Sequence, residues 1–259
     1  MSSPDRPIRR ITLGGVGVDI AERADVVESV RTRFVDREAP LLLVASANLQ
    51  HLGLYRPGGD SEHFFDRSVH EWLVLIDGSP IARQAGRVTG RPWPRLAGAD
   101  LLPDLLDVAR GADASVALVG GAPDLGGRLA EVCARRWPGL RFVGHWCPAR
   151  AELTDPVAMR AIADAMRTVG TDLVVVGLPK PISERWLDAW AEVAGARVGL
   201  AFGAAADFLV GDQTRAPEWV SRRGTEWLWR LAHDPKRFAR RYLVEGPGEY
   251  LRLRRDSHS

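Results

Sequence analysis

Short aliphatic runs alternate with segments of helical periodicity along most of the chain. The runs predict buried strands at residues 41–45, 72–76, 115–119, 140–143, 172–176 and 198–202. Before and between them, apolar residues recur at helical spacing, which predicts helices at residues 24–35, 61–69, 101–109, 125–136, 156–169 and 183–193. Residues 11–20 alternate apolar and small side chains around Gly14-Gly15, a pattern that favours an N-terminal hairpin.

Continuous apolar strands between amphipathic helices are typical of a parallel sheet that is covered on both faces. We therefore predict an α/β fold with a Rossmann-like, mostly parallel sheet, helices on both faces, and a helical, basic C-terminal appendage. The expected division is a body of residues 1–214 and an appendage of residues 215–259. A chain of 259 residues is long enough to bury the core of one such domain.

The chain carries no signal for secretion or for a membrane span. It has no run of eighteen apolar residues, and its first residues are polar and lack a hydrophobic signal region. The chain has two cysteines, which is unlike a secreted, disulfide-stabilised protein. These features predict a cytoplasmic protein.

The near-neutral net charge hides a basic end on an acidic body. Residues 215–255 hold eleven Lys or Arg against five Asp or Glu, while the rest of the chain holds 24 basic and 28 acidic residues. Trp and Arg alternate there at helical spacing. Because Arg binds phosphate through a planar fork and Trp suits a lipid headgroup boundary, an anionic lipid or a diphosphate is one expected partner. The alternative is an amphipathic helix that docks on the body through Trp227 and Leu231.

Other partners are not expected from the sequence. The body has no Lys/Arg block and no nucleic-acid motif accompanies the basic end, so we expect no nucleic acid. No G-x-G-x-x-G or Walker motif is present, which counts against a dinucleotide oxidoreductase or a P-loop NTPase. The six histidines lack metal-ligand spacing, and we expect neither a bound metal nor a cofactor. A homo-oligomer is compatible with the sequence.

Polar residues follow several of the predicted strands. In parallel sheets, ligands bind beyond the carboxyl ends of the strands, so these residues should converge on one rim. They are Ser46, Asn48, Asp77, the Gly120-Gly121 turn, the loop at residues 179–184 and Asp207. The glycine turn is either a phosphate cradle built from backbone N–H groups or a simple end to a strand.

Asp77 is the acid that we single out. It follows five apolar residues, so it sits at a strand end where burial can raise its pKa toward that of a general base. Gly78 permits a sharp turn and the close approach of a ligand. The alternative interpretation is an Asp that caps the next turn.

A series of motifs follows one another along about residues 10–245. They are Ser46-x-Asn48, Asp77-Gly78, Arg95-Leu96-x-Gly98, Gly120-Gly121-x-Pro123, Pro181-x-x-Glu184-x-Trp186, Phe202-Gly203 with Asp207-Phe208, Arg215-Ala216-Pro217-x-Trp219 and Glu226-Trp227-Leu228-x-Arg230-Leu231 followed by Arg237. The order and spacing of these motifs resemble the WecG/TagA/CpsF family of bacterial glycosyltransferases.

The resemblance implies an inverting, metal-independent enzyme at the inner face of the cytoplasmic membrane. It would transfer a sugar, typically N-acetylmannosamine, from a UDP donor to an undecaprenyl-diphosphate-linked sugar in teichoic acid, capsule or exopolysaccharide assembly. The general base would be Asp77. The implied substrate-binding residues are Ser46, Asn48, Arg95, Gly120, Gly121, Ser183, Glu184, Asp207, Arg215, Arg230 and Arg237.

The chain departs from the family pattern near the implied donor pocket. The family usually reads Pro-Lys-Gln-Glu where this chain has Pro181-Ile182-Ser183-Glu184, and Cys147-Pro148 replaces a usual Gly-Tyr pair. A different hexose or hexosamine is therefore a possible donor sugar. Two alternatives remain: a non-catalytic, membrane-associated member of a polysaccharide assembly complex, and an unrelated nucleotide-binding α/β enzyme.

Overall fold

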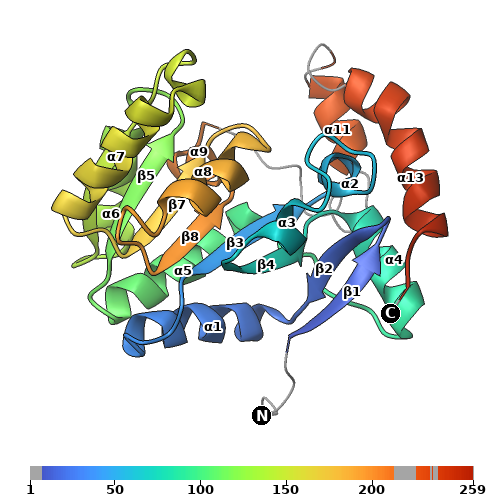
Figure 1. Ribbon diagram of the computed structural model, residues 1–259, viewed down its shortest axis with the longest axis horizontal. Helices are drawn as coiled ribbons and strands as arrows, with labels where there is room; N and C mark the ends of the chain where they lie inside the picture. Colours follow the sequence, from blue (N-terminus) through green and yellow to red (C-terminus); the bar gives the residue numbers. More distant parts are fainter. Residues whose placement is uncertain (1–7, 213–225, 234, 236–238, 259) are drawn as a thin grey trace.

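The computed structural model describes residues 8–212, 226–233, 235 and 239–258, and its centre is one twisted sheet (Figure 1). Of its eight strands, β2 to β8 all run parallel, and β1 pairs with β2 in the antiparallel sense. The spatial order is β1 (Arg9–Leu13), β2 (Val16–Ile20), β4 (Glu71–Ile76), β3 (Leu42–Ala47), β8 (Val198–Ala201), β7 (Leu173–Gly177), β5 (Ser115–Gly120) and β6 (Arg141–Trp146).

Helices cover both faces of the sheet, as the sequence predicts. One face carries α1 (Arg23–Val35), α5 (Gly98–Gly111), α6 (Leu125–Arg136) and α9 (Ala205–Val210). The other carries α2 (Leu49–Tyr55), α3 (Phe64–Arg67), α4 (Ser79–Thr89), α7 (Pro156–Thr168) and α8 (Ile182–Trp190). Alternate residues of each strand serve the two layers: in β3, Val44 packs under the first face and Ala45 under the second. Because both faces are buried, the strands need to be apolar throughout.

The predicted N-terminal hairpin is confirmed, and a buried carboxylate attaches it to the sheet. Gly14 and Gly15 both have positive φ (60° and 82°), the backbone that a tight two-residue turn requires. Asp19 on β2 is buried, and its carboxylate accepts hydrogen bonds from Arg10 (2.8 and 3.0 Å) and from the backbone N–H of Val74 (2.7 Å). The β2–β4 pairing is short, and the Asp19 carboxylate extends it by bonding β4 directly.

The C-terminal segment returns to the body. Its described elements are α11 (Glu226–His233), a π-helical stretch (Arg240–Glu245) and α13 (Gly246–Arg255). Helix α13 packs on α2 and α4, and Leu253 is buried in the same core as the sheet. Beyond it, the Ser257 hydroxyl accepts from Gly14 N–H (3.1 Å), and His258 pairs with Thr12 of β1. The expected boundary at residues 214 and 215 lies outside the described residues, and α13 beyond it is docked on the body.

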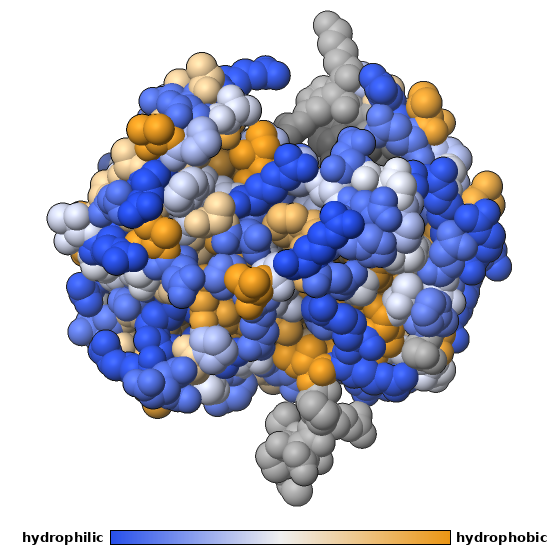
Figure 2. Space-filling model, viewed as in Figure 1, coloured by the Kyte–Doolittle hydropathy of each residue, from blue (hydrophilic) through white to orange (hydrophobic). Residues whose placement is uncertain are grey.

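The surface of the C-terminal helices is mixed in character. Figure 2 shows hydrophobic residues scattered among hydrophilic ones on the side of the molecule where α13 lies. The exposed aliphatic side chains of the C-terminal elements are Leu228 on α11, Leu243 and Val244 on the π-helical stretch, and Leu251 on α13. Among the described residues, none of the helices combines the length and the apolar content needed to cross a bilayer.

Candidate active site

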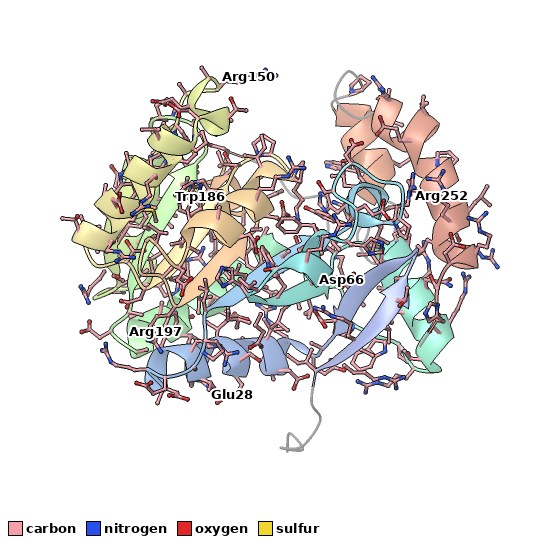
Figure 3. All side chains as sticks on the ribbon, viewed as in Figure 1. Glu28, Asp66, Arg150, Trp186, Arg197 and Arg252 are labelled. Atoms are coloured by element: carbon pink, nitrogen blue, oxygen red, sulfur yellow. The ribbon has the colours of Figure 1, made fainter. Side chains whose placement is uncertain are left out.

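The polar residues predicted at strand ends lie along one rim of the sheet. Strands β4, β3, β8, β7 and β5 are consecutive neighbours and all parallel, so their carboxyl ends are adjacent. In Figure 3 the rim lies between Arg150, which follows β6, and Arg252 on α13. This is the place where a doubly wound sheet binds its ligands.

Asp77 stands directly after β4 and is half-buried. Its backbone N–H donates to the carbonyl oxygen of Ala47 (2.8 Å), which ties it to the end of β3. The next residue, Gly78, has φ of 123° and is the N-cap of α4. The N-cap position of α4 is thus held by Gly78, and Asp77 precedes it at the end of β4.

Ser46 and Asn48 close the end of β3. Ser46 is buried. Asn48 is the N-cap of α2, and its side-chain oxygen accepts from the N–H groups of Gln50 (3.1 Å) and His51 (3.4 Å). The backbone N–H of Asn48 donates in return to His51 Nδ1 (3.1 Å). The oxygen of the Asn48 amide therefore serves the helix, and the NH₂ group is the half that suits a ligand.

Arg95 lies beside Asp77. The residue after it, Leu96, donates its backbone N–H to the carbonyl oxygen of Ile76 (2.7 Å), one residue before Asp77. The Arg95 guanidinium is partly exposed and lies 3.5 Å from the carboxylate of Asp100. Gly98, in the same motif, packs on the Phe202 ring: a Cβ at Gly98 would lie 2.5 Å from a ring carbon. This packing and the backbone bond to Ile76 fix the Arg95 motif at the end of β4, the strand that Asp77 follows.

The glycine turn after β5 brings three strand ends into close backbone contact. Gly120 and Gly121 both have positive φ (89° and 84°). A Cβ at Gly120 would lie 2.7 Å from Leu178 Cδ2 and 3.0 Å from the carbonyl carbon of Gly177. A Cβ at Gly177 would in turn lie 3.3 Å from the carbonyl oxygen of Gly203. The ends of β5, β7 and β8 thus meet as bare backbone, which suits the close approach of a phosphate.

Side chains of β6 and of the residue after it hold this turn from its other side. His145 Nε2 lies 2.8 Å from the carbonyl oxygen of Gly120, and Cys147 Sγ donates to that of Gly121 (3.1 Å). Gly126 of α6 leaves room for the imidazole, because a Cβ there would lie 2.4 Å from His145 Cβ. Both turn carbonyls are therefore bound, and the position of the turn is fixed relative to the rim.

The loop from β7 to α8 points two of the predicted residues inward. Ser183 is fully buried, and its hydroxyl donates to the carbonyl oxygen of Leu178 (2.6 Å). Glu184 is also fully buried and forms an ion pair with Lys180 (2.7 Å). In this structure both residues brace the loop, and a direct substrate contact stays a prediction. Lys180, whose type and spacing gave no motif, reaches the end of β3, where its ammonium donates to the carbonyl oxygen of Ser46 (2.7 Å).

The remaining predicted residues come from the C-terminal third of the chain. Asp207 lies on α9, the helix that follows β8, and is half-buried. Arg215 and Arg237 lie outside the described residues. Arg230 belongs to α11, but its side chain is outside the described part. The described residues contain no group of three His, Cys, Asp or Glu side chains that could hold a metal ion.

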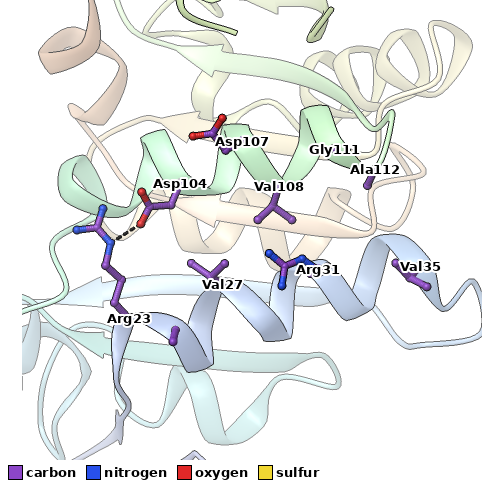
Figure 4. A pocket seen from close by; sticks show the side chains of 10 residues that line it. Arg23, Val27, Arg31, Val35, Asp104, Asp107, Val108, Gly111 and Ala112 are labelled. Atoms are coloured by element: carbon purple, nitrogen blue, oxygen red, sulfur yellow. Dashed lines mark hydrogen bonds and ion pairs between the residues drawn. The ribbon is translucent and has the colours of Figure 1, made fainter. Parts of the chain in front are cut away.

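A groove of about 670 Å³ lies away from this rim, between α1 and α5 (Figure 4). Arg23 pairs with Asp104 across its end, and Val27 and Val108 form part of its floor. The groove contains none of the strand-end residues. It is the outer seam between two helices of one layer, and the polar residues of the rim do not reach it.

Comparison with known proteins identifies the chain. The family described as Glycosyl transferase WecG/TagA/CpsF family matches residues 11–258. The chain belongs to this family. The match runs from β1 to His258 and so includes the docked C-terminal helix as well as the sheet. The family resemblance expected from the motifs is confirmed, and the protein is a glycosyltransferase.

Curated relatives in the WecG/TagA/CpsF family are distant in sequence but similar in extent. The chain is 21% identical over 231 residues to an N-acetylglucosaminyldiphosphoundecaprenol N-acetyl-beta-D-mannosaminyltransferase of Staphylococcus aureus (strain MRSA252), covering 89% of this chain and 87% of the relative. It is 24% identical over 177 residues to a protein of the same name from Bacillus subtilis (strain 168), covering 68% and 67%. Both relatives are named for transfer of N-acetylmannosamine to a lipid-diphosphate-linked sugar.

Proposed function

We propose that this glycosyltransferase moves a sugar from a UDP-sugar to an undecaprenyl-diphosphate-linked sugar, in cell-surface polysaccharide or teichoic acid assembly. The observation that supports the proposal is that three features lie at one rim: the carboxylate Asp77 after β4, the motif of the cation Arg95, which is bonded to the end of β4, and the Gly120-Gly121 turn. The acceptor and the cell-surface role rest on the names of the relatives. The donor sugar is N-acetylmannosamine or another hexose or hexosamine, because the loop at residues 179–184 departs from the family pattern.

In the proposed reaction, Asp77 removes the proton of the acceptor hydroxyl as that oxygen attacks the anomeric carbon. The bond from that carbon to the UDP oxygen breaks on the opposite side, so the configuration inverts. Negative charge then develops on the leaving diphosphate. Arg95 and the backbone N–H groups of the glycine turn are the donors that stabilise this charge without a divalent ion.

UDP is expected to bind and to raise the thermal unfolding temperature in the presence of a chelator. The physical reason is that Arg95 and the turn supply the positive charge and the hydrogen-bond donors that a metal would otherwise supply. The measurement is a calorimetric titration with UDP in EDTA, repeated with magnesium. Binding that appears only with magnesium would contradict the metal-free mechanism.

The second candidate is a non-catalytic, membrane-associated member of an assembly complex. The exposed aliphatic side chains of the C-terminal elements favour it, because a membrane-binding surface does not require a working site at the rim. The two candidates differ in one observable, the release of UDP when a UDP-sugar and a lipid-diphosphate acceptor are both present. Release above the rate without acceptor supports the transferase. Membrane binding without release supports the second candidate.

We further propose that the C-terminal helices contact an anionic membrane surface at the inner face of the cytoplasmic membrane. Leu243 and Val244 are 59% and 71% exposed, and the side chain of neighbouring Arg240 is 84% exposed. Exposed aliphatic side chains beside arginines are suited to the boundary between lipid headgroups and acyl chains.

The double substitution Leu243→Gln, Val244→Gln is expected to lower partitioning onto vesicles containing anionic lipid by at least about tenfold, because two side chains lose burial in the acyl region. Vesicle sedimentation measures this. Val157→Gln is the matched control, since Val157 on α7 is 77% exposed and lies on another part of the surface. Equal loss in the control, or no loss in the double variant, would contradict the assignment of this surface.

A further inference from the structure

Lys180 connects the β7–α8 loop to β3 across the end of β8. Its ammonium donates to the carbonyl oxygen of Ser46 (2.7 Å) and pairs with the carboxylate of Glu184 (2.7 Å). The Lys180 side chain is 11% exposed and that of Glu184 is not exposed at all. Because β8 lies between β7 and β3, the lysine spans the middle of the proposed site.

The choice of lysine is itself informative in this chain. Of 35 basic residues, 33 are arginine, and the two lysines are Lys180 and Lys236. Arginine presents a wide planar fork, whereas lysine presents a compact ammonium with three donors. The position between Ser46 and Glu184 is closed and needs a small cation that reaches two acceptors at once. Lysine therefore stands at this position although almost all the other basic residues of the chain are arginine.

A second buried polar group lies near Glu184. The Tyr55 hydroxyl, from α2, is buried close to Glu184; burial, and then the Glu184 carboxylate, raise the pKa of this hydroxyl, so it stays protonated. A buried carboxylate is costly without a cation, and Lys180 supplies that cation. Tyr55 of α2, Glu184 of α8 and Lys180 of the β7–α8 loop therefore form one buried polar cluster. Within it, Lys180 is the residue that bonds to the end of β3.

The backbone at the end of β3 connects Ser46, which Lys180 bonds, to the proposed base Asp77. The next residue, Ala47, accepts the backbone N–H of Asp77 at 2.8 Å, and Asn48 follows as the cap of α2. We propose that Lys180, oriented by Glu184, is a positioning residue for sugar transfer: it fixes the end of β3 and thereby the placement of Asp77 against the substrates. This inference rests on the proposed function.

The test removes the pair as a unit. Lys180→Met alone leaves a buried carboxylate without its cation and is expected to lower the Tm by roughly 10 °C. In Lys180→Met, Glu184→Met both charges are gone, and the Tm is expected to return to within a few degrees of the wild type. If that double variant does not fold, Lys180→Gln, Glu184→Gln carries the same test with polar side chains.

The double variant is expected to bind UDP like the wild type and to keep its donor KM within a few fold, while kcat falls by about 10- to 100-fold. Arg160→Met, Asp164→Met removes an exposed pair of the same spacing on α7 and should leave kcat unchanged. Recovery of kcat together with Tm in the Lys180/Glu184 double variant would show a purely structural pair and overturn the inference. Failure of the proposed function is distinguishable, because the wild type would then neither bind nor release UDP.

Discussion

Asp77→Asn is expected to lower kcat for sugar transfer by about 10²- to 10⁴-fold, while the variant keeps its fold and its affinity for UDP. An amide has nearly the volume of a carboxylate but cannot accept the proton of the acceptor hydroxyl. The backbone bond from Asp77 N–H to Ala47 does not depend on the side chain, so the turn into α4 is expected to persist. The measurement is UDP release at saturating donor and acceptor, beside a UDP titration.

Asp107→Asn is the matched control for this substitution. Asp107 is an exposed carboxylate on α5, at the groove away from the rim, and its replacement should leave turnover within about twofold. Near-normal turnover of Asp77→Asn at saturating substrates would show that another group takes the proton. Loss of UDP binding in that variant would instead indicate a role in holding the donor.

The regular part of the fold could be predicted because burial leaves a direct pattern in the sequence. The central strands read as continuous aliphatic runs, since each faces a helical layer on both sides. Helix α4 was not predicted, although it is strongly amphipathic; only Ile81, Gln84 and Ala85 are buried in it, and one of these three is polar. The helix expected at residues 61–69 is the single turn α3. The order of the strands in the sheet could not be predicted either, because β8 lies between β3 and β7 through contacts between residues far apart in the chain.

The site could be located better than its side chains could be oriented. Parallel strands carry their following residues to one edge, so Asn48, Asp77 and Gly120 were correctly expected to converge there. Ser183 and Glu184 were linked to substrate through a motif, but they share the buried face of α8 with Leu187. Helical spacing places residues 183, 184 and 187 on one side, and that signal was present in the sequence. The rarity of lysine was a similar signal for Lys180.

Gly120→Ala is expected to weaken UDP binding by roughly 10- to 100-fold. Its Cβ would lie 3.0 Å from the backbone of Gly177 and 2.7 Å from Leu178, so the turn must move away from β7. A turn displaced by a few tenths of an ångström loses at least one hydrogen bond to the diphosphate, and a bond to a charged group is worth about 1.5–3 kcal/mol. The positive φ adds backbone strain of about 1–2 kcal/mol against stability.

Gly170→Ala separates these two effects. Gly170 also has positive φ (71°), but it follows α7, and a Cβ added there would meet no atom within 4 Å. It should therefore share the loss of stability, measured by urea denaturation, and keep the UDP affinity of the wild type. If both alanine variants bind UDP equally well, the contact between the ends of β5 and β7 is ordinary chain packing, and the diphosphate is held elsewhere on the rim. A loss confined to Gly120→Ala supports contact between the diphosphate and the turn, because both substitutions share the backbone strain and only Gly120→Ala displaces the backbone at the rim.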